Sequence, residues 1–364
     1  PFVGQAKERI HRITTFEPTP TSTSLDKLAQ LLASLIGGEA KGESAFHLGE
    51  IYLNDLKNFE AAMKMFTSAI ENKVAEPNLA EAYYYRARSQ QLLAEKNRTP
   101  SDTALKVYEE FLKHYPSHPH SADAAAQIAL LKISSSPQVD ISKIAEGFVL
   151  KYPGSAAGDL VVLAAADTLM GQGKYDKAAL SYQQLLAWFP SSARREEALF
   201  RLGLSMEKLG KKDSTRAAFE TYLRSYPEGS YGPEVLSSVA REAFQSGRAQ
   251  ESIDLYRRLI ERYYYTPQRQ EAEYGLATAY AEAGQPDSAI TQCQVLLQKQ
   301  RENIFGERDS LEVLYLLGNL YQQKRERSAA KKYYLACLRQ DRTSGRAAEV
   351  LSSLGRLYRD EGNP

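Results

Sequence analysis

Three histidines stand close enough together in this sequence to suggest metal chemistry. His114, His118 and His120 form the pattern H-x3-H-x-H, and imidazoles at such short spacing can bind Zn²⁺ or Ni²⁺. Two prolines between them fix the direction of the chain, and Asp123 is the one clearly placed carboxylate nearby. We therefore interpret the stretch as a solvated loop and predict no metal site.

A second cluster combines arginines with tyrosines, a combination that can stack nucleic-acid bases. Arg257 and Arg258 precede the run from Arg262 to Tyr265. The whole chain holds 46 Lys and Arg against 45 Asp and Glu, so it lacks the basic excess typical of nucleic-acid-binding proteins. We predict that arginine stems pack on the tyrosines, and we expect no nucleic-acid partner.

The remaining chemistry-bearing residues do not form a catalytic set. The sequence contains no P-loop, nucleophile elbow or HExxH motif. Its two cysteines, Cys293 and Cys337, fall on apolar helix faces and are predicted to be free, buried thiols. We therefore predict that the protein is not an enzyme and needs no cofactor.

No run of 18 apolar residues is present, so we predict no membrane-spanning segment. The chain starts at Pro1 without a methionine, which leaves a removed signal peptide or a lipid anchor open. The low cysteine content is compatible with either an oxidising or a reducing compartment.

The stretch from Ser155 to Pro190 shows which elements position these side chains. An apolar first half is followed by Gly171 and Gly173, and then by Ala178, Tyr182 and Leu185 at i, i+4, i+7 spacing. That spacing predicts an amphipathic helix, and the glycines predict a turn before it. The stretch is therefore a predicted helix–turn–helix hairpin, which cannot bury its apolar faces without neighbours.

The hairpin recurs along the chain. Pro116, Pro153, Pro190 and Pro227 each lie 37 residues apart and close successive units. Small residues at matching positions of the predicted first helices are Gly49, Ala87, Ala129, Ala166, Gly203, Ala240, Ala277, Gly318 and Gly355. A nearly fixed period over this length predicts an all-α solenoid of about eight to nine hairpins.

Three regions follow from this register. Residues 1–24 are predicted to be an extended arm, residues 25–42 a capping helix, and residues 43–364 the repeat array. We expect an insertion between the helices of the second unit at Ala94–Ser101, and a longer connection at Lys299–Ser310. The last unit ends after one helix, whose apolar side could support self-association.

The repeats resemble the tetratricopeptide repeat (TPR) family. Its first-helix motif matches Leu48-Gly49-x2-Tyr52 and Leu317-Gly318-x2-Tyr321, and its second-helix motif matches Ala178-x3-Tyr182. Thr215 and Ile141 depart from the second-helix alanine. The resemblance implies an α–α superhelix that binds a protein or peptide in its concave groove.

The sequences that close each unit, such as Lys151-Tyr152-Pro153 and Trp188-Phe189-Pro190, resemble bacterial envelope TPR proteins. Those include Tol–Pal-associated coordinators and the lipoprotein of the outer-membrane barrel-assembly machine. The resemblance implies a periplasmic or outer-membrane-associated scaffold. The alternative is a cytoplasmic TPR adaptor or regulatory module of a multiprotein complex.

Groove positions follow from the same register. We predict partner contacts from aromatic residues three positions before the small residue, and from polar residues immediately after it: Phe46, Tyr84, Phe200, Tyr274, Tyr315, Arg241 and Asn319. The alternative is that the aromatic residues pack against the adjacent second helix. No consecutive units supply the Lys/Asn/Arg clamp that chaperone-type TPRs use for a C-terminal carboxylate.

An acidic ladder lies six positions before the small residues. Its members are Glu43, Glu81, Asp123, Glu197, Glu234, Glu271, Glu312 and Glu349. A stripe of this kind could recruit a basic ligand. We favour a simpler interpretation, that each carboxylate sits in the first turn of a helix and interacts favourably with the helix dipole.

Overall fold

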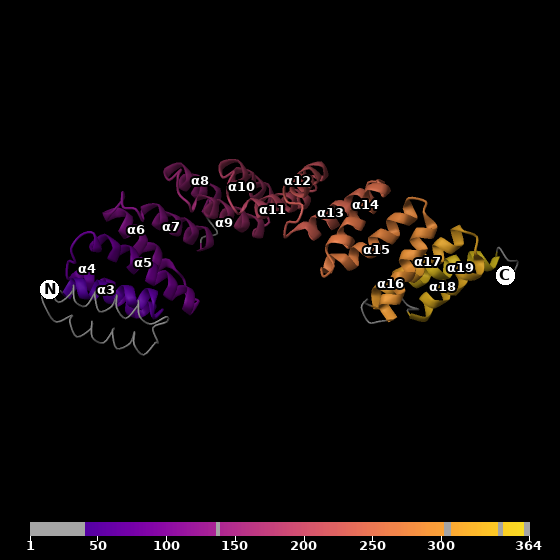
Figure 1. Ribbon diagram of the computed structural model, residues 1–364, viewed down its shortest axis with the longest axis horizontal. Helices are drawn as coiled ribbons and strands as arrows, with labels where there is room; N and C mark the ends of the chain where they lie inside the picture. The colour runs from indigo at the N-terminus through magenta and orange to yellow at the C-terminus, as the bar shows by residue number, and fades with distance from the viewer. Residues whose placement is uncertain (1–40, 136–138, 302–306, 341–344, 360–364) are drawn as a thin grey trace. The chain divides into compact units, whose positions relative to one another are not determined.

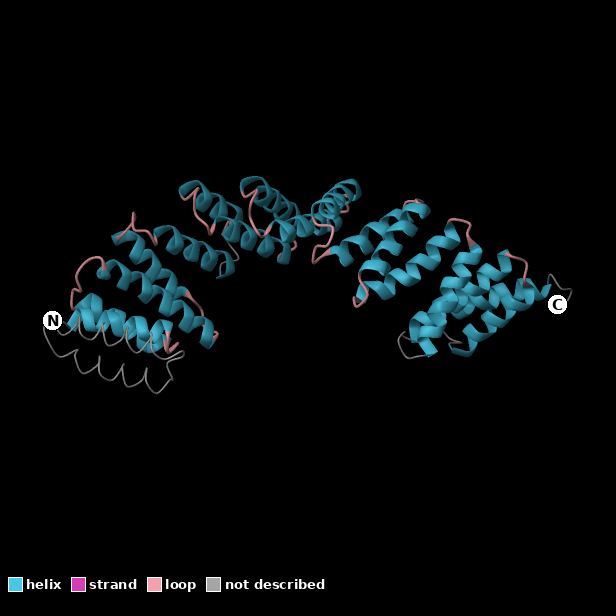
Figure 2. Ribbon diagram, viewed as in Figure 1, coloured by secondary structure: helices cyan, strands magenta, loops and turns pink. Residues whose placement is uncertain are grey.

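The computed structural model describes residues 41–135, 139–301, 307–340 and 345–359, and all regular secondary structure in these ranges is helical (Figure 2). The helices that begin each repeat are α3 (Lys41–Asn54), α5 (Asn78–Asn97), α7 (Ser121–Ser135), α9 (Gly158–Gly171), α11 (Arg195–Lys208), α13 (Gly232–Gln245), α15 (Pro267–Glu282), α17 (Glu307–Gln323) and α19 (Gly345–Arg359). Their partners are α4 (Phe59–Glu71), α6 (Asp102–His114), α8 (Ile141–Lys151), α10 (Tyr175–Trp188), α12 (Lys212–Ser225), α14 (Ala249–Arg262), α16 (Pro286–Arg301) and α18 (Arg327–Gln340).

Within each of the two parts described next, consecutive helices pair into hairpins and neighbouring hairpins stack (Figure 1). The chain divides into two compact parts, residues 1–198 and 199–364, with the boundary inside α11. In the first part α3 contacts α4 and α5, and α9 contacts α7, α8 and α10. In the second part α15 contacts α13, α14, α16 and α17. First helices therefore contact one another as well as their hairpin partners.

Glycines close the turns inside the hairpins. Gly173, Gly210, Gly247 and Gly284 each stand 37 residues apart and each adopts a positive φ between 69° and 75°. Glycine takes this left-handed conformation without the steric penalty that a Cβ causes. At the matching position of the α17–α18 hairpin Arg325 adopts φ 61°. This turn therefore keeps the left-handed conformation although arginine, which has a Cβ, adopts it less readily than glycine.

In five of the described hairpins the core is built around one aromatic residue of the second helix, at the same position of the repeat. Phe66, Tyr108, Tyr182, Phe219 and Tyr334 are all fully buried. A Cβ added at Gly49 would lie 2.8 Å from the Phe66 ring, and one added at Gly203 or Gly318 would overlap Phe219 or Tyr334. The small residues of the repeat thus let the first helix approach a large ring closely.

The structure confirms the predicted all-α solenoid of helical hairpins. Two predicted connections are shorter than we expected, because helices extend into them. Ala94–Asn97 continues α5, leaving only the short turn before α6, and α16 and α17 run into the segment that we assigned to a loop. The stretch Ala94-Glu95-Lys96-Asn97 contains mostly good helix formers and no glycine or proline, which explains the continuation.

The predicted arm, residues 1–24, lies outside the described residues, as does most of the predicted capping helix, residues 25–42. Lys41 and Gly42 are described and begin α3. Both regional assignments therefore stay predictions.

Candidate functional site

The acidic ladder joins neighbouring repeats. Asn78 Nδ2 donates to Glu43 Oε2 (2.9 Å), and Gln268 Nε2 donates to Glu234 Oε1 (3.0 Å). Each donor lies in the first turn of the next first helix, so a side-chain contact ties each of these pairs of repeats together. The carboxylates are not a free stripe for a basic ligand.

Other members of the ladder use different donors. Arg346 binds Glu312 through both Nε and Nη2, at 3.1 and 2.6 Å. One position along from the ladder, Asp159 accepts from Ser192 Oγ at 2.5 Å and from Arg194 Nη1 at 3.2 Å. We call these contacts, together with those of Glu43, Glu81 and Glu234, the inter-repeat latches.

At Glu81 the latch is made by histidines. His120 Nε2 lies 3.1 Å from Glu81 Oε2, and His118 Nε2 lies 3.7 Å from Oε1. The His120 ring also stacks on Tyr84, with 4.3 Å between ring centroids. Our interpretation of the stretch as a solvated loop is therefore wrong for His118 and His120, which are half-buried between repeats, although His114 is exposed. No group of His, Cys, Asp and Glu among the described residues is arranged to hold a metal ion.

Two of the predicted groove aromatics are buried. Phe46 is 3% exposed and lies edge-on to Phe66, with ring centroids 5.9 Å apart. Tyr84 is 7% exposed, and its hydroxyl donates to Asp123. Burial, and then the Asp123 carboxylate, raise the pKa of Tyr84 above its usual range. These two side chains offer little surface to a partner and pack against neighbouring helices, as the alternative interpretation expects.

Three other predicted aromatics are half-buried. Phe200 stacks on Tyr231 with centroids 4.3 Å apart, and the guanidinium of Arg346 lies 4.4 Å from the centre of the Tyr315 ring. Tyr274 packs against the core of the second part. Each keeps part of its side chain accessible, so a contact with a partner stays a prediction for them.

Asn319 on α17 accepts a hydrogen bond from the hydroxyl of Tyr334 on α18, the second helix of the same hairpin. Tyr334 Oη is 2.7 Å from Asn319 Oδ1 and donates to it. Tyr182 and Asp167 make the same contact in their own hairpin, also at 2.7 Å. The predicted groove residue Asn319 thus holds its hairpin together, and burial raises the pKa of Tyr334.

Arg241 is the predicted groove residue that lines a hollow. The hollow has a volume of about 160 Å³ and lies between α11, α12 and α13. Its walls are polar or charged apart from one glycine: Glu207, Gly210, Lys212, Thr215, Ser238, Arg241, Glu242 and Gln245. Arg241 is largely exposed and pairs with Glu271 at 2.9 Å, an arrangement that leaves its guanidinium accessible from solvent.

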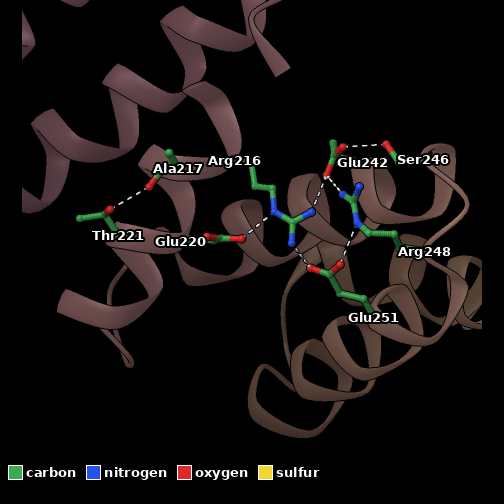
Figure 3. A network of polar contacts seen from close by, with 8 residues as sticks. All are labelled: Arg216, Ala217, Glu220, Thr221, Glu242, Ser246, Arg248 and Glu251. Atoms are coloured by element: carbon green, nitrogen blue, oxygen red, sulfur yellow. Dashed lines mark hydrogen bonds and ion pairs between the residues drawn. The ribbon is translucent and has the colours of Figure 1, made fainter. Parts of the chain in front are cut away.

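A network of ion pairs fixes one wall of this hollow (Figure 3). Arg248 Nη2 binds Glu242 Oε2 at 2.5 Å, and Arg216 binds Glu251 at 2.7 Å and Glu220 at 2.6 Å. The hydrogen bond to Glu220, together with the negative charges of Glu251, Glu220 and Glu242, raises the pKa of Arg216. Because the network joins α12, α13 and α14, the carboxylate of Glu242 is held in place and its charge is balanced by arginines.

The remaining walls are held by hydrogen bonds. Ser238 Oγ donates to Glu207 Oε1 at 3.1 Å, and Thr215 Oγ1 donates to the carbonyl of Lys211 at 3.0 Å. The register did not identify Glu207, Lys212, Ser238, Glu242 and Gln245 as site residues. The sequence did contain one indication of this site: Thr215 replaces the alanine of the repeat motif, and its side chain lines the hollow.

The arginine–tyrosine cluster divides into two. Arg257 donates from Nε to the Tyr280 hydroxyl (2.8 Å), with its guanidinium 5.4 Å from the ring centre, in line with the predicted packing. Tyr264 and Tyr265 instead protrude into solvent. Cys293 and Cys337 are free and buried as predicted, and burial raises the pKa of the Cys293 thiol to about 12.

Models of the tetratricopeptide repeat family match residues 240–304, residues 81–118 and 197–229, and residues 42–73 and 311–344. Together these matches span more than half of the chain. The chain belongs to the tetratricopeptide repeat family. No curated protein sequence matches it.

Solved TPR structures are similar at low identity. YrrB, described as a TPR protein with an unusual peptide-binding site, is 15% identical, covers 57% of this chain and 99% of its own, and gives a TM-score of 0.46. A TPR protein from Parabacteroides merdae is 14% identical over 74% and 98% of the two chains, with a TM-score of 0.40. MamA is 21% identical over 48% and 94%, with a TM-score of 0.40. None of the helices in the described ranges is both long and apolar enough to cross a membrane.

Proposed function

We propose that this TPR protein is a non-enzymatic scaffold that binds an extended peptide segment of a partner protein. TPR arrays generally serve as protein-interaction scaffolds. The observation that carries the proposal is the polar hollow beside Arg241, which three helices of two successive repeats build together. In this proposal one polar side chain of the bound segment enters the hollow.

The size of the hollow supports a side chain as its occupant. Small-molecule sites usually enclose about 300–1,000 Å³, whereas this hollow holds about 160 Å³. Arg241 and Lys212 can donate hydrogen bonds, and Glu207 can accept them. An amide side chain, which both donates and accepts, matches this lining. Phe200, Tyr274 and Tyr315 stay proposed contacts for apolar parts of the same segment.

Site-specific photo-crosslinking tests the proposal. A photoreactive residue at Gln245, on the wall of the hollow, is compared with one at Lys177, which is exposed on α10 in the other part of the chain. In lysate of the source cells we expect a crosslinked partner peptide from position 245 and none from position 177. Mass spectrometry then identifies the segment, which can be synthesised.

Titration calorimetry with that synthetic segment completes the test. Loss of a charged hydrogen bond typically costs about 1.5–3 kcal/mol, so we expect Arg241→Ala to weaken binding about tenfold or more. Arg224→Ala, which removes an exposed arginine of α12 outside the hollow, serves as the matched control. Equal affinities for wild type and Arg241→Ala would rule out the hollow as the binding site.

The proposed location is the bacterial cell envelope, supported by the loop sequences that close the repeats; the alternative is a cytoplasmic adaptor. Fractionation of source cells with an antibody against the protein separates the two. Self-association also stays a proposal. It is supported by a hollow of about 360 Å³ beside Leu335, Leu338 and Leu351 on α18 and α19, and light scattering over a concentration series tests it.

A further inference from the structure

Two tyrosines at the tip of the α14–α15 loop protrude into solvent. Tyr264 is 65% exposed and Tyr265 is 95% exposed. Their rings form an edge-to-face pair with centroids 5.0 Å apart. Large aromatic side chains at a loop tip expose apolar surface without stabilising the fold, and exposed apolar groups that gather in one place mark interaction sites.

The repeats themselves show that the fold does not need these tyrosines. Tyr263 fills the structural position, since its ring packs against Gly232 as Phe189 packs against Gly158. The next two residues are Pro-Ser, Pro-Gly, Pro-Ser and Pro-Glu in the four loops that lie 148, 111, 74 and 37 residues earlier. The α14–α15 loop carries Tyr-Tyr instead, at positions where a proline and a small or polar residue close the same turn.

One of the two rings is held in a fixed orientation. The guanidinium of Arg269 lies 4.2 Å from the centre of the Tyr264 ring. Arg269 is itself fixed, because it donates to the carbonyl of Ile260 at 2.7 Å and pairs with Glu273 at 3.0 Å. A ring that is oriented before binding loses less conformational entropy when a partner docks.

The loop and the residues that flank it carry more basic than acidic side chains. Residues 257–269 contain four arginines and one glutamate, whereas the equivalent stretch 220–232 contains Arg224 with Glu220 and Glu228. Arg262, the last residue of α14, is exposed and donates to the carbonyl of Pro227. The surface thus combines aromatic faces with cationic groups, a combination that favours an anionic partner.

We propose that the Tyr264–Tyr265 tip is a second interaction surface, separate from the hollow beside Arg241, and that it binds an acidic peptide segment. Tyrosine and arginine are the side chains that most often dominate protein-binding surfaces. The balanced charge of the whole chain, 46 against 45, disfavours nucleic acid.

A loop exchange within the protein provides a variant that we expect to keep its fold. Tyr264→Pro/Tyr265→Ser installs the residues Pro190-Ser191 that close the same turn two repeats earlier. Leu150→Ser, which removes another side chain of high exposure (82%), is the matched control. Circular dichroism and thermal melting should show both variants to be folded like wild type.

A displayed library of random dodecapeptides is selected on the full wild-type chain, and enriched peptides are synthesised with a fluorescent label. We expect the enriched peptides to be rich in Asp and Glu. The loop exchange and Arg262→Gln should each weaken their binding at least tenfold in anisotropy titrations, and Leu150→Ser should leave it unchanged. Raising the salt concentration should weaken the binding as well.

Three outcomes overturn the proposal. The first is enrichment of peptides without acidic residues, and the second is equal binding to wild type and to the loop exchange. The third is tighter binding of a 20-nucleotide oligothymidylate, or of phosphatidylglycerol vesicles, that the loop exchange abolishes. That last result would assign the tip to nucleic acid or to membrane.

Discussion

The hydroxyl of Tyr334 shows how one polar group inside a hairpin joins its two helices. It lies 2.7 Å from oxygen atoms of both Asn319 and Gln322 on the preceding helix. Tyr108 makes a comparable contact with Gln91 at 2.9 Å. Asn319, which the repeat register assigns to a binding groove, therefore also stabilises its hairpin. If a substitution there weakens binding, the folding of the variant must be checked separately.

Tyr334→Phe should lower the free energy of unfolding by about 1 kcal/mol, because the amide oxygens on α17 lose their buried donor while the ring is retained. Urea denaturation followed by circular dichroism measures the change. Tyr358→Phe, at a partly exposed tyrosine of α19, should change the stability by a few tenths at most. Equal effects of the two substitutions would contradict the role assigned to Tyr334.

At the scale of the element, the hairpin depends on a close approach between helices. Gly49, Gly203 and Gly318 face aromatic rings of their partner helices, whereas Gly355, at the same repeat position in α19, has no described atom within 4 Å of an added Cβ. The same repeat position is thus under steric constraint in three hairpins and open in the last described helix.

Gly203→Ala should destabilise the protein by about 1–3 kcal/mol, the usual range for overpacking a core. The added methyl group would overlap the ring of Phe219. Gly355→Ala should be neutral or slightly stabilising, since alanine favours a helix over glycine by up to about 1 kcal/mol. Differential scanning calorimetry of both variants checks the contrast, and a stable Gly203→Ala protein would show that the ring can move aside.

The register of prolines, glycines and small residues was sufficient to predict the hairpins, because each of these residues acts within its own turn or helix. The latches could not be predicted in the same way, since His120 and Arg346 meet carboxylates 39 and 34 residues away. Burial of Phe46 and Tyr84 also depends on a neighbouring repeat. The hollow could not be predicted from the register, because its walls come from three helices whose relative positions the sequence does not give. Thr215, which replaces the alanine of the repeat motif, was the one residue whose type pointed to it.

At the scale of the whole molecule, buried acids of high pKa link stability to pH. Burial raises the pKa of the Cys293 thiol from 9.0 to about 12 and that of Tyr256 from 10.0 to about 12. The folded chain therefore holds these protons more tightly than the unfolded chain. The resulting stability is fully present below about pH 9 and is lost as the pH rises toward 12.

Between pH 8 and pH 10.5 we expect the free energy of unfolding to fall by about 2–3 kcal/mol from these two groups. Urea denaturation at a series of pH values measures the fall. Cys293→Ala lowers the stability at every pH but should make this dependence shallower, since the thiol no longer titrates. An unchanged slope in that variant would show that Cys293 does not contribute to the alkaline loss.

The inter-repeat latches have a consequence for how the chain assembles. Arrays of similar hairpins are prone to stacking in the wrong order while they fold. Here the carboxylates of the five latches meet three kinds of donor: amides at Asn78 and Gln268, imidazoles at His118 and His120, and guanidinium groups at Arg194 and Arg346. A hairpin docked on the wrong neighbour would face a donor of the wrong length or charge. The varied latches thus make repeats that are alike in shape distinguishable by the chemistry of their junctions.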